Sequence, residues 1–143
     1  MSSPFKQFAT SNTLEIEGVW LNFGDFEIRV ARAGGSNKRF AKATDQYFEN
    51  HRRAAEIGAL QESVAAEALA NVYADAVILG WRTKSSEGYV DTIGGPNGEP
   101  WDFTRENVIK LLTLLPDFFA TLRKHCENFQ NFRRALLEQD AKN

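Results

Sequence analysis

Apolar and polar residues alternate in two short stretches near the N-terminus, which is the period of a strand with one buried face. The first stretch is Leu14–Leu21 and the second is Phe26–Val30, with a Gly24-Asp25 turn between them. This pattern predicts an antiparallel β-hairpin over residues 14–31, preceded by a flexible leader over residues 1–13. The inner face of the hairpin is expected to carry Leu14, Ile16, Phe26, Ile28 and Val30.

Apolar residues then recur at helical spacing in two segments. Ser36 or Asn37 can cap a helix over about residues 37–57 by accepting free N–H groups of its first turn. A second, alanine-rich helix is predicted over residues 61–80. The apolar positions are Phe40, Ala43 and Tyr47 in the first helix and Ala65, Leu69, Val72, Ala76 and Leu79 in the second.

The chain between residues 84 and 103 is rich in turn formers, which predicts a loop holding at most one short strand or hairpin. Residues 105–138 have the strongest helical pattern in the sequence. Pro116 lies inside that pattern and predicts a kink, so we expect two helices or one bent helix. The apolar stripe of this segment comprises Val108, Leu112, Leu115, Phe119, Leu122, Cys126 and Phe129.

These elements predict a mainly α-helical bundle with a small N-terminal β-hairpin, at the α+β margin. A chain of 143 residues fits a single domain, here residues 14–143. Hydrophobic residues at 43% and charged residues at 25% are typical of a soluble globular protein. The apolar runs are too short for a membrane span, the first twelve residues lack a signal peptide, and a single Cys fits a reducing compartment, so we expect a cytoplasmic protein without a membrane partner.

The charged residues are unevenly distributed along the chain. Residues 28–53 carry seven Lys and Arg against two acidic residues, whereas residues 54–106 carry nine acidic residues against three Lys and Arg. Such a separation produces either ordinary solvated helix faces or a dipolar surface that docks against a partner or a second copy. The net charge of −2 argues against a dedicated nucleic-acid-binding protein, so no nucleic-acid partner is expected.

The residue types that usually carry catalysis are few and badly spaced. His125 and Cys126 are adjacent and would project from a helix about 100° apart, which prevents a nucleophile–base pair. One Cys and two His cannot supply the four ligands of a structural zinc site from these types alone. The glycine-rich stretch 94–98 has no Lys-Ser/Thr after it and is interpreted as a turn. We therefore expect no enzymatic activity, no metal and no cofactor.

Three tryptophans, Trp20, Trp81 and Trp101, end or flank predicted elements. One interpretation is that they seal the core where the hairpin and the long loop meet the helices. The alternative is a ligand or peptide groove at the long loop, lined by Trp81, Tyr89 and Trp101.

Several short motifs follow one another in a recognisable order. They are L-E-I-E-G-V-W-L at 14–21, F-E-I-R-V-A-R-A-G-G at 26–35, V-I-L-G-W at 77–81, G-E-P-W-D-F-T-R-E-N at 98–107 and L-L-T-L-L-P-D at 111–117. Together they resemble the tail assembly chaperones of long-tailed, siphovirus-type bacteriophages. The resemblance runs from about Leu14 to Phe132 and is most specific from Ile78 to Asp117.

The resemblance implies a non-enzymatic protein of the infected host's cytoplasm that is absent from the mature virion. Its implied partners are the tape measure protein and the tail tube protein. Amphipathic helices that form grooves and self-associate suit this role. Two surfaces are candidate contact sites: the basic helix, with Lys38, Arg39 and Lys42, and the distal C-terminal face, with Phe129, Phe132, Arg133 and Leu136.

Two other functions stay open at this point. The first is a small phage DNA-binding regulator that uses the basic helix over residues 38–53. The second is a structural neck or tail-completion protein, which would be found in purified virions.

Overall fold

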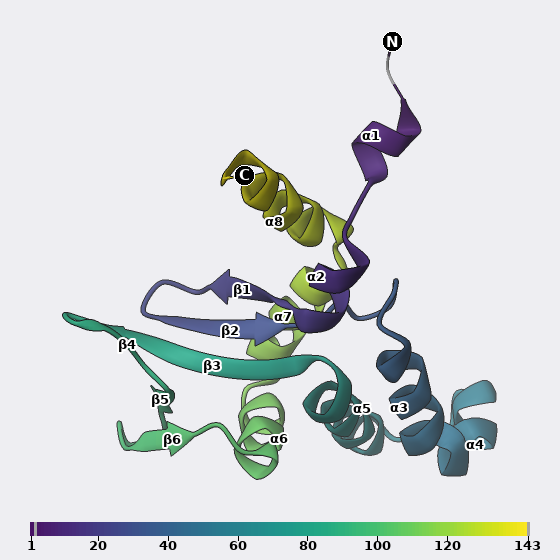
Figure 1. The fold of residues 1–143 in the computed structure, drawn as a ribbon. Helices are drawn as coiled ribbons and strands as arrows, with labels where there is room; N and C mark the ends of the chain where they lie inside the picture. The colour runs from purple at the N-terminus through teal and green to yellow at the C-terminus, as the bar shows by residue number, and fades with distance from the viewer. Residues whose placement is uncertain (2, 143) are drawn as a thin grey trace.

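The computed structural model describes residue 1 and residues 3–142, and its centre is a four-stranded antiparallel sheet bordered by helices (Figure 1). The strand order is β1-β2-β3-β4, and a separate two-stranded sheet pairs β5 with β6. The strands are β1 (Val19–Asn22), β2 (Phe26–Val30), β3 (Ile78–Ser85), β4 (Gly88–Val90), β5 (Thr92–Gly94) and β6 (Pro100–Asp102).

The helices are α1 (Pro4–Phe8), α2 (Asn12–Glu17), α3 (Lys38–Phe48), α4 (Arg52–Glu56), α5 (Glu62–Ala76), α6 (Arg105–Leu114), α7 (Pro116–Glu127) and α8 (Phe129–Lys142). A single 3-10 turn over Glu49–His51 joins α3 to α4. Helix α8 contacts β1, and helix α5 contacts β3 and leads into its start (Figure 1). Helix α3 packs on the outer side of α5.

The prediction of a mainly helical bundle with one N-terminal hairpin is wrong, because strands continue through the chain to residue 102 and the fold is α+β. Residues 78–80, expected to end a helix, instead begin β3, which lies between β2 and β4. Helix α5 ends at Ala76, where the sequence changes from alanines to Val77, Ile78 and Trp81. β-branched and aromatic residues favour strands, and the helical spacing of Leu79 was a coincidence.

The N-terminal hairpin is shorter than the predicted range of residues 14–31. Residues 12–17 form α2, because Ser11 accepts a hydrogen bond from the N–H of Leu14 at 3.3 Å and caps the helix. Ile16, expected on the inner face, is therefore exposed. The strand pair itself joins Val19 to Val30 at one end and Asn22 to Glu27 at the other.

The core lies between the four-stranded sheet and helices α5, α6, α7 and α8. Tyr73 of α5 is at its centre, with its ring edge-on to Phe40 at 6.0 Å and to Phe119 at 5.1 Å between centroids. The remaining fully buried side chains come from both sheet and helices: Ile28, Val30, Val72, Val77, Val108, Leu112, Leu122, Cys126 and Phe132.

The predicted C-terminal helix is divided into α6, α7 and α8. The first break is at Leu115, which leaves the helical conformation (φ −122°, ψ 73°) because Pro116 disfavours a helical residue before it. The second break is at Asn128, whose side chain accepts a hydrogen bond from the N–H of Gln130 at 3.0 Å and caps the start of α8. The prediction included the first break and missed the second.

Candidate functional site

The three basic residues predicted as a contact site lie at the start of α3 with exposed side chains. Lys38 and Lys42 face solvent, and Arg39 donates a 2.5 Å hydrogen bond from Nη2 to the backbone carbonyl of Asp75 on α5. Other cations of the basic segment lie elsewhere, and Arg32 pairs with the buried Glu15 at 2.9 Å. The positive charge is therefore divided between different parts of the fold.

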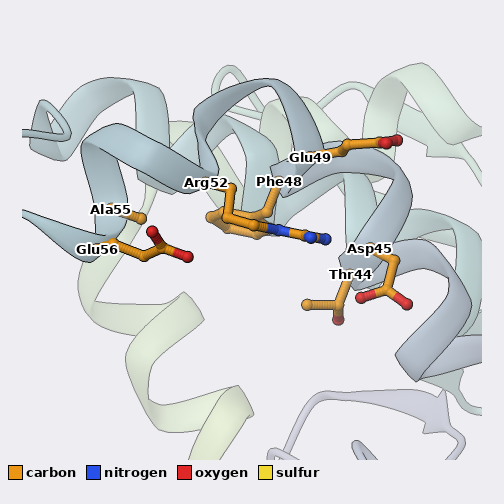
Figure 2. A pocket seen from close by; sticks show the side chains of 7 residues that line it. All are labelled: Thr44, Asp45, Phe48, Glu49, Arg52, Ala55 and Glu56. Carbon is orange, nitrogen blue, oxygen red and sulfur yellow. The ribbon is translucent and has the colours of Figure 1, made fainter.

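A hollow of about 330 Å³ lies where α3 meets α4. Figure 2 shows the Arg52 side chain running across Phe48, with the carboxylates of Asp45, Glu49 and Glu56 around it. These carboxylates offset the charge of Arg52. This part of the predicted basic helix is a surface of mixed charge, unlike the purely basic stripe that phosphate binding requires.

The predicted C-terminal face is partly covered by the chain's own N-terminal segment and partly buried in the core. Phe132 is 0% exposed and belongs to the core. The ring of Phe129 stacks on Phe8 of α1 at 5.2 Å, and Arg133 donates a 3.2 Å hydrogen bond to the carbonyl of Ala9. Leu136 is half-buried. Helices α3 and α8 lie well apart in Figure 1, so the two predicted sets of residues do not form one site.

An apolar groove lies between the β5–β6 hairpin and α6, at the long loop where the sequence left a groove as an alternative. Its larger part has a volume of about 350 Å³, and an adjoining part of about 230 Å³ continues toward the β2–β3 side and α7. Leu114 and Leu115 line it and are 61% and 51% exposed. We call this surface the leucine groove, and its lining includes Phe26, Ile93, Gly94, Pro96, Trp101, Leu111, Leu114, Leu115 and Phe118.

The β5–β6 turn holds Trp101 in place as one wall of the leucine groove. Glu99 accepts hydrogen bonds from the indole N–H of Trp101 at 3.1 Å and from the N–H of Asn97 at 2.8 Å. The hydrogen bond from its own backbone N–H has the largest effect, and those from Asn97 and Trp101 add to it. Together they stabilise the carboxylate and keep the pKa of Glu99 below its usual value. A Cβ on Gly95 would come within 2.4 Å of the Trp101 indole nitrogen, so the ring can lie this close only over glycine.

Of the three aromatic residues considered for a groove at the long loop, only Trp101 lines the leucine groove. Trp81 is 3% exposed and donates a 3.2 Å hydrogen bond from its indole to the carbonyl of Trp101. Tyr89 lies away from it, where its ring and that of Trp20 each lie 3.8 Å from the Arg82 guanidinium. One feature of the sequence could have indicated the leucine groove. Leu114 precedes Leu115 and Pro116 and lies off the predicted apolar stripe, so the helix carries an apolar residue outside its core-facing side.

A polar network fixes the start of α6, which carries the leucines of the groove. Arg105 donates to Asp75 at 2.6 Å, to Asn71 at 2.7 Å and to the hydroxyl of Tyr47 at 2.8 Å. Tyr47 also donates to Asp75, and this bond raises the pKa of the tyrosine. Partial burial alone would raise the pKa of Asp75, but the hydrogen bonds from Arg105 and Tyr47 lower it below its usual value. The network joins α3, α5 and α6 and has a structural role.

Metal-binding and thiol chemistry find little support in the geometry. Among the residues that the structure describes, no group of three or more His, Cys, Asp or Glu side chains is placed to hold a metal ion. Cys126 is fully buried, and burial raises the pKa of its thiol far above the usual value, which suppresses the reactive thiolate. His125 instead contacts Phe23 edge-on at 6.0 Å between centroids.

Within the described part of the chain, no helix has both the length and the apolar character needed to cross a membrane.

Comparison with protein families assigns most of the chain to one of them. The family model described as YdaY prophage protein matches residues 35–143, which is well over half of the chain and includes α3 through α8. No curated protein and no solved structure matches this chain. The chain therefore belongs to the YdaY prophage protein family and is of phage origin.

Proposed function

We propose that this protein is a non-enzymatic tail assembly chaperone that binds tail tube subunits and the tape measure protein in the host cytoplasm and is absent from the mature virion. Its membership of a prophage family supports a role in the life of a phage. The finer assignment is supported by the resemblance over residues 14–132. A chaperone of this kind covers apolar surface that its partner exposes before assembly, so it needs an apolar surface of its own.

The leucine groove is the observation that carries this proposal. An apolar groove with two largely exposed leucines is unusual on a soluble monomer and is typical of a protein interaction site. Residues 78–117, where the resemblance is most specific, supply most of its lining, including Trp101, Leu111 and Leu115. The same residues thus connect the sequence resemblance to a surface of suitable chemistry.

The DNA-binding alternative has less support from the geometry. The basic residues are separated in space, and carboxylates surround Arg52. A duplex-binding protein of this size would place its Lys and Arg on one face and would lose affinity steeply as salt rises.

Co-expression with the tail tube and tape measure proteins of the same phage tests the proposal. The critical variant is Leu115→Asp, which puts a charge into the leucine groove at the N-cap of α7, where Asp is favourable to the helix. Its matched control is Leu137→Asp, because Leu137 on α8 is 52% exposed and lies outside the groove. We expect Leu115→Asp to reduce recovery of the partner about tenfold in a pull-down and Leu137→Asp to leave it unchanged.

Two results would count against this account. Equal recovery with both variants would show that the leucine groove does not bind the partner. Failure of the wild-type chain to recover either partner, with both folded and present, would contradict the chaperone function itself. A salt-sensitive shift of duplex DNA in the same preparation would then favour the regulator.

A further inference from the structure

A second groove lies on the other side of α6 from the leucine groove. Ile109 and Leu112 of α6 line this second groove, whereas Leu111 and Leu114 line the first. Its volume is about 850 Å³, more than twice that of the larger part of the leucine groove. Helices α5 and α7 provide most of its other walls, with Phe48 of α3 at one side, so we call it the α5–α7 groove.

The α5–α7 groove combines an apolar floor with an acidic rim. The floor includes Leu69, Ile109 and Phe119. The rim carries Glu62 and Glu67 on α5 and Asp117 on α7. Within the described residues, none of these three carboxylates forms an ion pair. An occupant that complements both features has an apolar ridge with positive charges on each side of it.

Two of the three carboxylates have a second role that must be separated from binding. Glu62 and Asp117 lie in the first turns of α5 and α7, where a negative charge stabilises the helix dipole. Glu67 lies beyond the first turn of α5 and has no such role. Substitution of Glu67 therefore tests binding without changing the charge near the helix N-terminus.

The backbone of the occupant is also constrained by the groove. Helices α5, α6 and α7 keep their backbone hydrogen bonds within themselves, so the walls offer no strand edge for an extended peptide to pair with. An extended segment buried on Leu69 and Phe119 would leave its own N–H and C=O groups unpaired. A helix satisfies these groups internally.

The side chains on the α5 side of the groove are small enough for a partner helix to approach closely. Ser63, Ala65 and Ala66 line the groove on the α5 side, and none of them projects far from the helix surface. At the α7 side, Arg123 has its guanidinium 5.0 Å from the Phe119 ring, and its buried Nε has no hydrogen-bond acceptor. The last carbonyls of an occupant helix, which have no partner within the helix, would supply that acceptor.

We propose that the α5–α7 groove binds an amphipathic α-helix of a partner protein, with an apolar ridge on the groove floor and Lys or Arg residues against Glu62, Glu67 and Asp117. This site goes beyond the proposed function, because it lies on the opposite side of α6 from the leucine groove and can be tested without any tail protein. Failure at one groove leaves the other unaffected.

The test uses a fluorescently labelled synthetic helix of about 18 residues, about five turns long, with Leu on one face and Lys on the other. A peptide with Glu in place of Lys is the charge control. The rim variant is Glu62→Gln with Glu67→Gln and Asp117→Asn, and its matched control is Glu17→Gln with Glu106→Gln and Asp140→Asn, which removes equal charge from exposed positions elsewhere. The groove is filled by Ala66→Trp, with Ala41→Trp on α3 as its control.

Fluorescence anisotropy should show that the Lys peptide binds the wild-type chain and the Glu peptide does not. We expect the rim variant and Ala66→Trp each to weaken binding about tenfold, and both controls to stay within about twofold. Circular dichroism establishes that each variant is folded.

Three results would overturn the proposal. Equal weakening by the rim variant and its control would indicate general attraction between an acidic protein and a basic peptide. Normal binding by folded Ala66→Trp would show that the groove is not occupied. A wild-type dimer in light scattering that the groove variants convert to a monomer would assign the groove to a second copy.

Discussion

At the scale of single residues, Asn37 joins two distant segments of the chain through one buried amide. Its Nδ2 donates to the carbonyl of Arg32 at 2.9 Å and to that of Ala76, at the end of α5, at 2.8 Å. The sequence predicted this residue as a helix cap, and it does occupy the N-cap position of α3. Its side chain nevertheless makes no capping hydrogen bond. Tertiary packing determines whether such a side chain bonds to a local or a distant partner. The spacing of residues in the sequence does not reveal that packing.

Substitution Asn37→Ala should destabilise the fold by about 1–3 kcal/mol, because it leaves two carbonyls at a buried position without their donor. Urea unfolding followed by tryptophan fluorescence measures the change. Asn50→Ala, at an exposed position of the 3-10 turn, is the control and should have little effect. A loss no larger than that of the control would contradict the role given to Asn37.

Glu15 is a second buried polar residue with a distant partner. It accepts hydrogen bonds from Thr10 at 2.6 Å, from Arg32 at 2.9 Å and from the N–H of Ser36 at 3.1 Å. Burial alone would raise the pKa of this carboxyl, but the three donors hold it below its ordinary value of 4.5. Glu15 thereby joins α2 to the segment that follows β2.

The lowered pKa of Glu15 predicts how stability depends on pH. A carboxyl whose folded pKa lies below the unfolded value stabilises the protein above the unfolded pKa, and this contribution is lost as pH falls through the folded pKa. Glu15→Gln should therefore lower the urea midpoint at neutral pH and make its decline on acidification shallower. Urea titrations across the acid range measure this slope. Parallel slopes for variant and wild type would contradict the assignment.

At the scale of elements, α1 is the helix least integrated into the fold. It stands apart from the sheet in Figure 1 and meets α8 through the Phe8–Phe129 stack. Phe5 on the same helix is 86% exposed. Because α1 covers part of the predicted C-terminal contact face, it controls access to Phe129 and Arg133.

Deletion of residues 1–9 should cost about 1 kcal/mol or less, since the stack it removes is partly exposed and the core is untouched. If the α8 face binds a partner, the same deletion should strengthen that binding by uncovering Phe129. Thermal unfolding and the pull-down with tail proteins measure the two effects. A large drop in stability would show that α1 is a structural part of the domain.

The elements also show where prediction from sequence succeeds. Strong periodicity located the helical segment after Arg105, and Pro116 predicted its first break. Strand β3 was missed because Leu79 continues the spacing of α5, and only pairing with β2 reveals a strand. The short strands β4 to β6 carry three residues each, too few for a periodic signal.

At the scale of the whole molecule, the surfaces suited to partners depend on the tertiary fold. The leucine groove combines residues from 25 to 118 of the chain, and the α5–α7 groove combines residues from 48 to 123. The sequence did predict charged blocks, but folding divides the basic block between α3, α4 and the region of β2. Phe132 was predicted to be a contact residue but is buried. Sequence spacing does not show which elements will pack over a given side chain.

The most direct test of the proposed function is the state of the tail tube subunit when it is made with this protein. The two chains are co-expressed and purified together, and light scattering measures the mass of what is recovered. The account predicts one soluble complex of defined stoichiometry in which the tube subunit stays unassembled. Tube subunits that polymerise or aggregate to the same extent with and without this protein would contradict it.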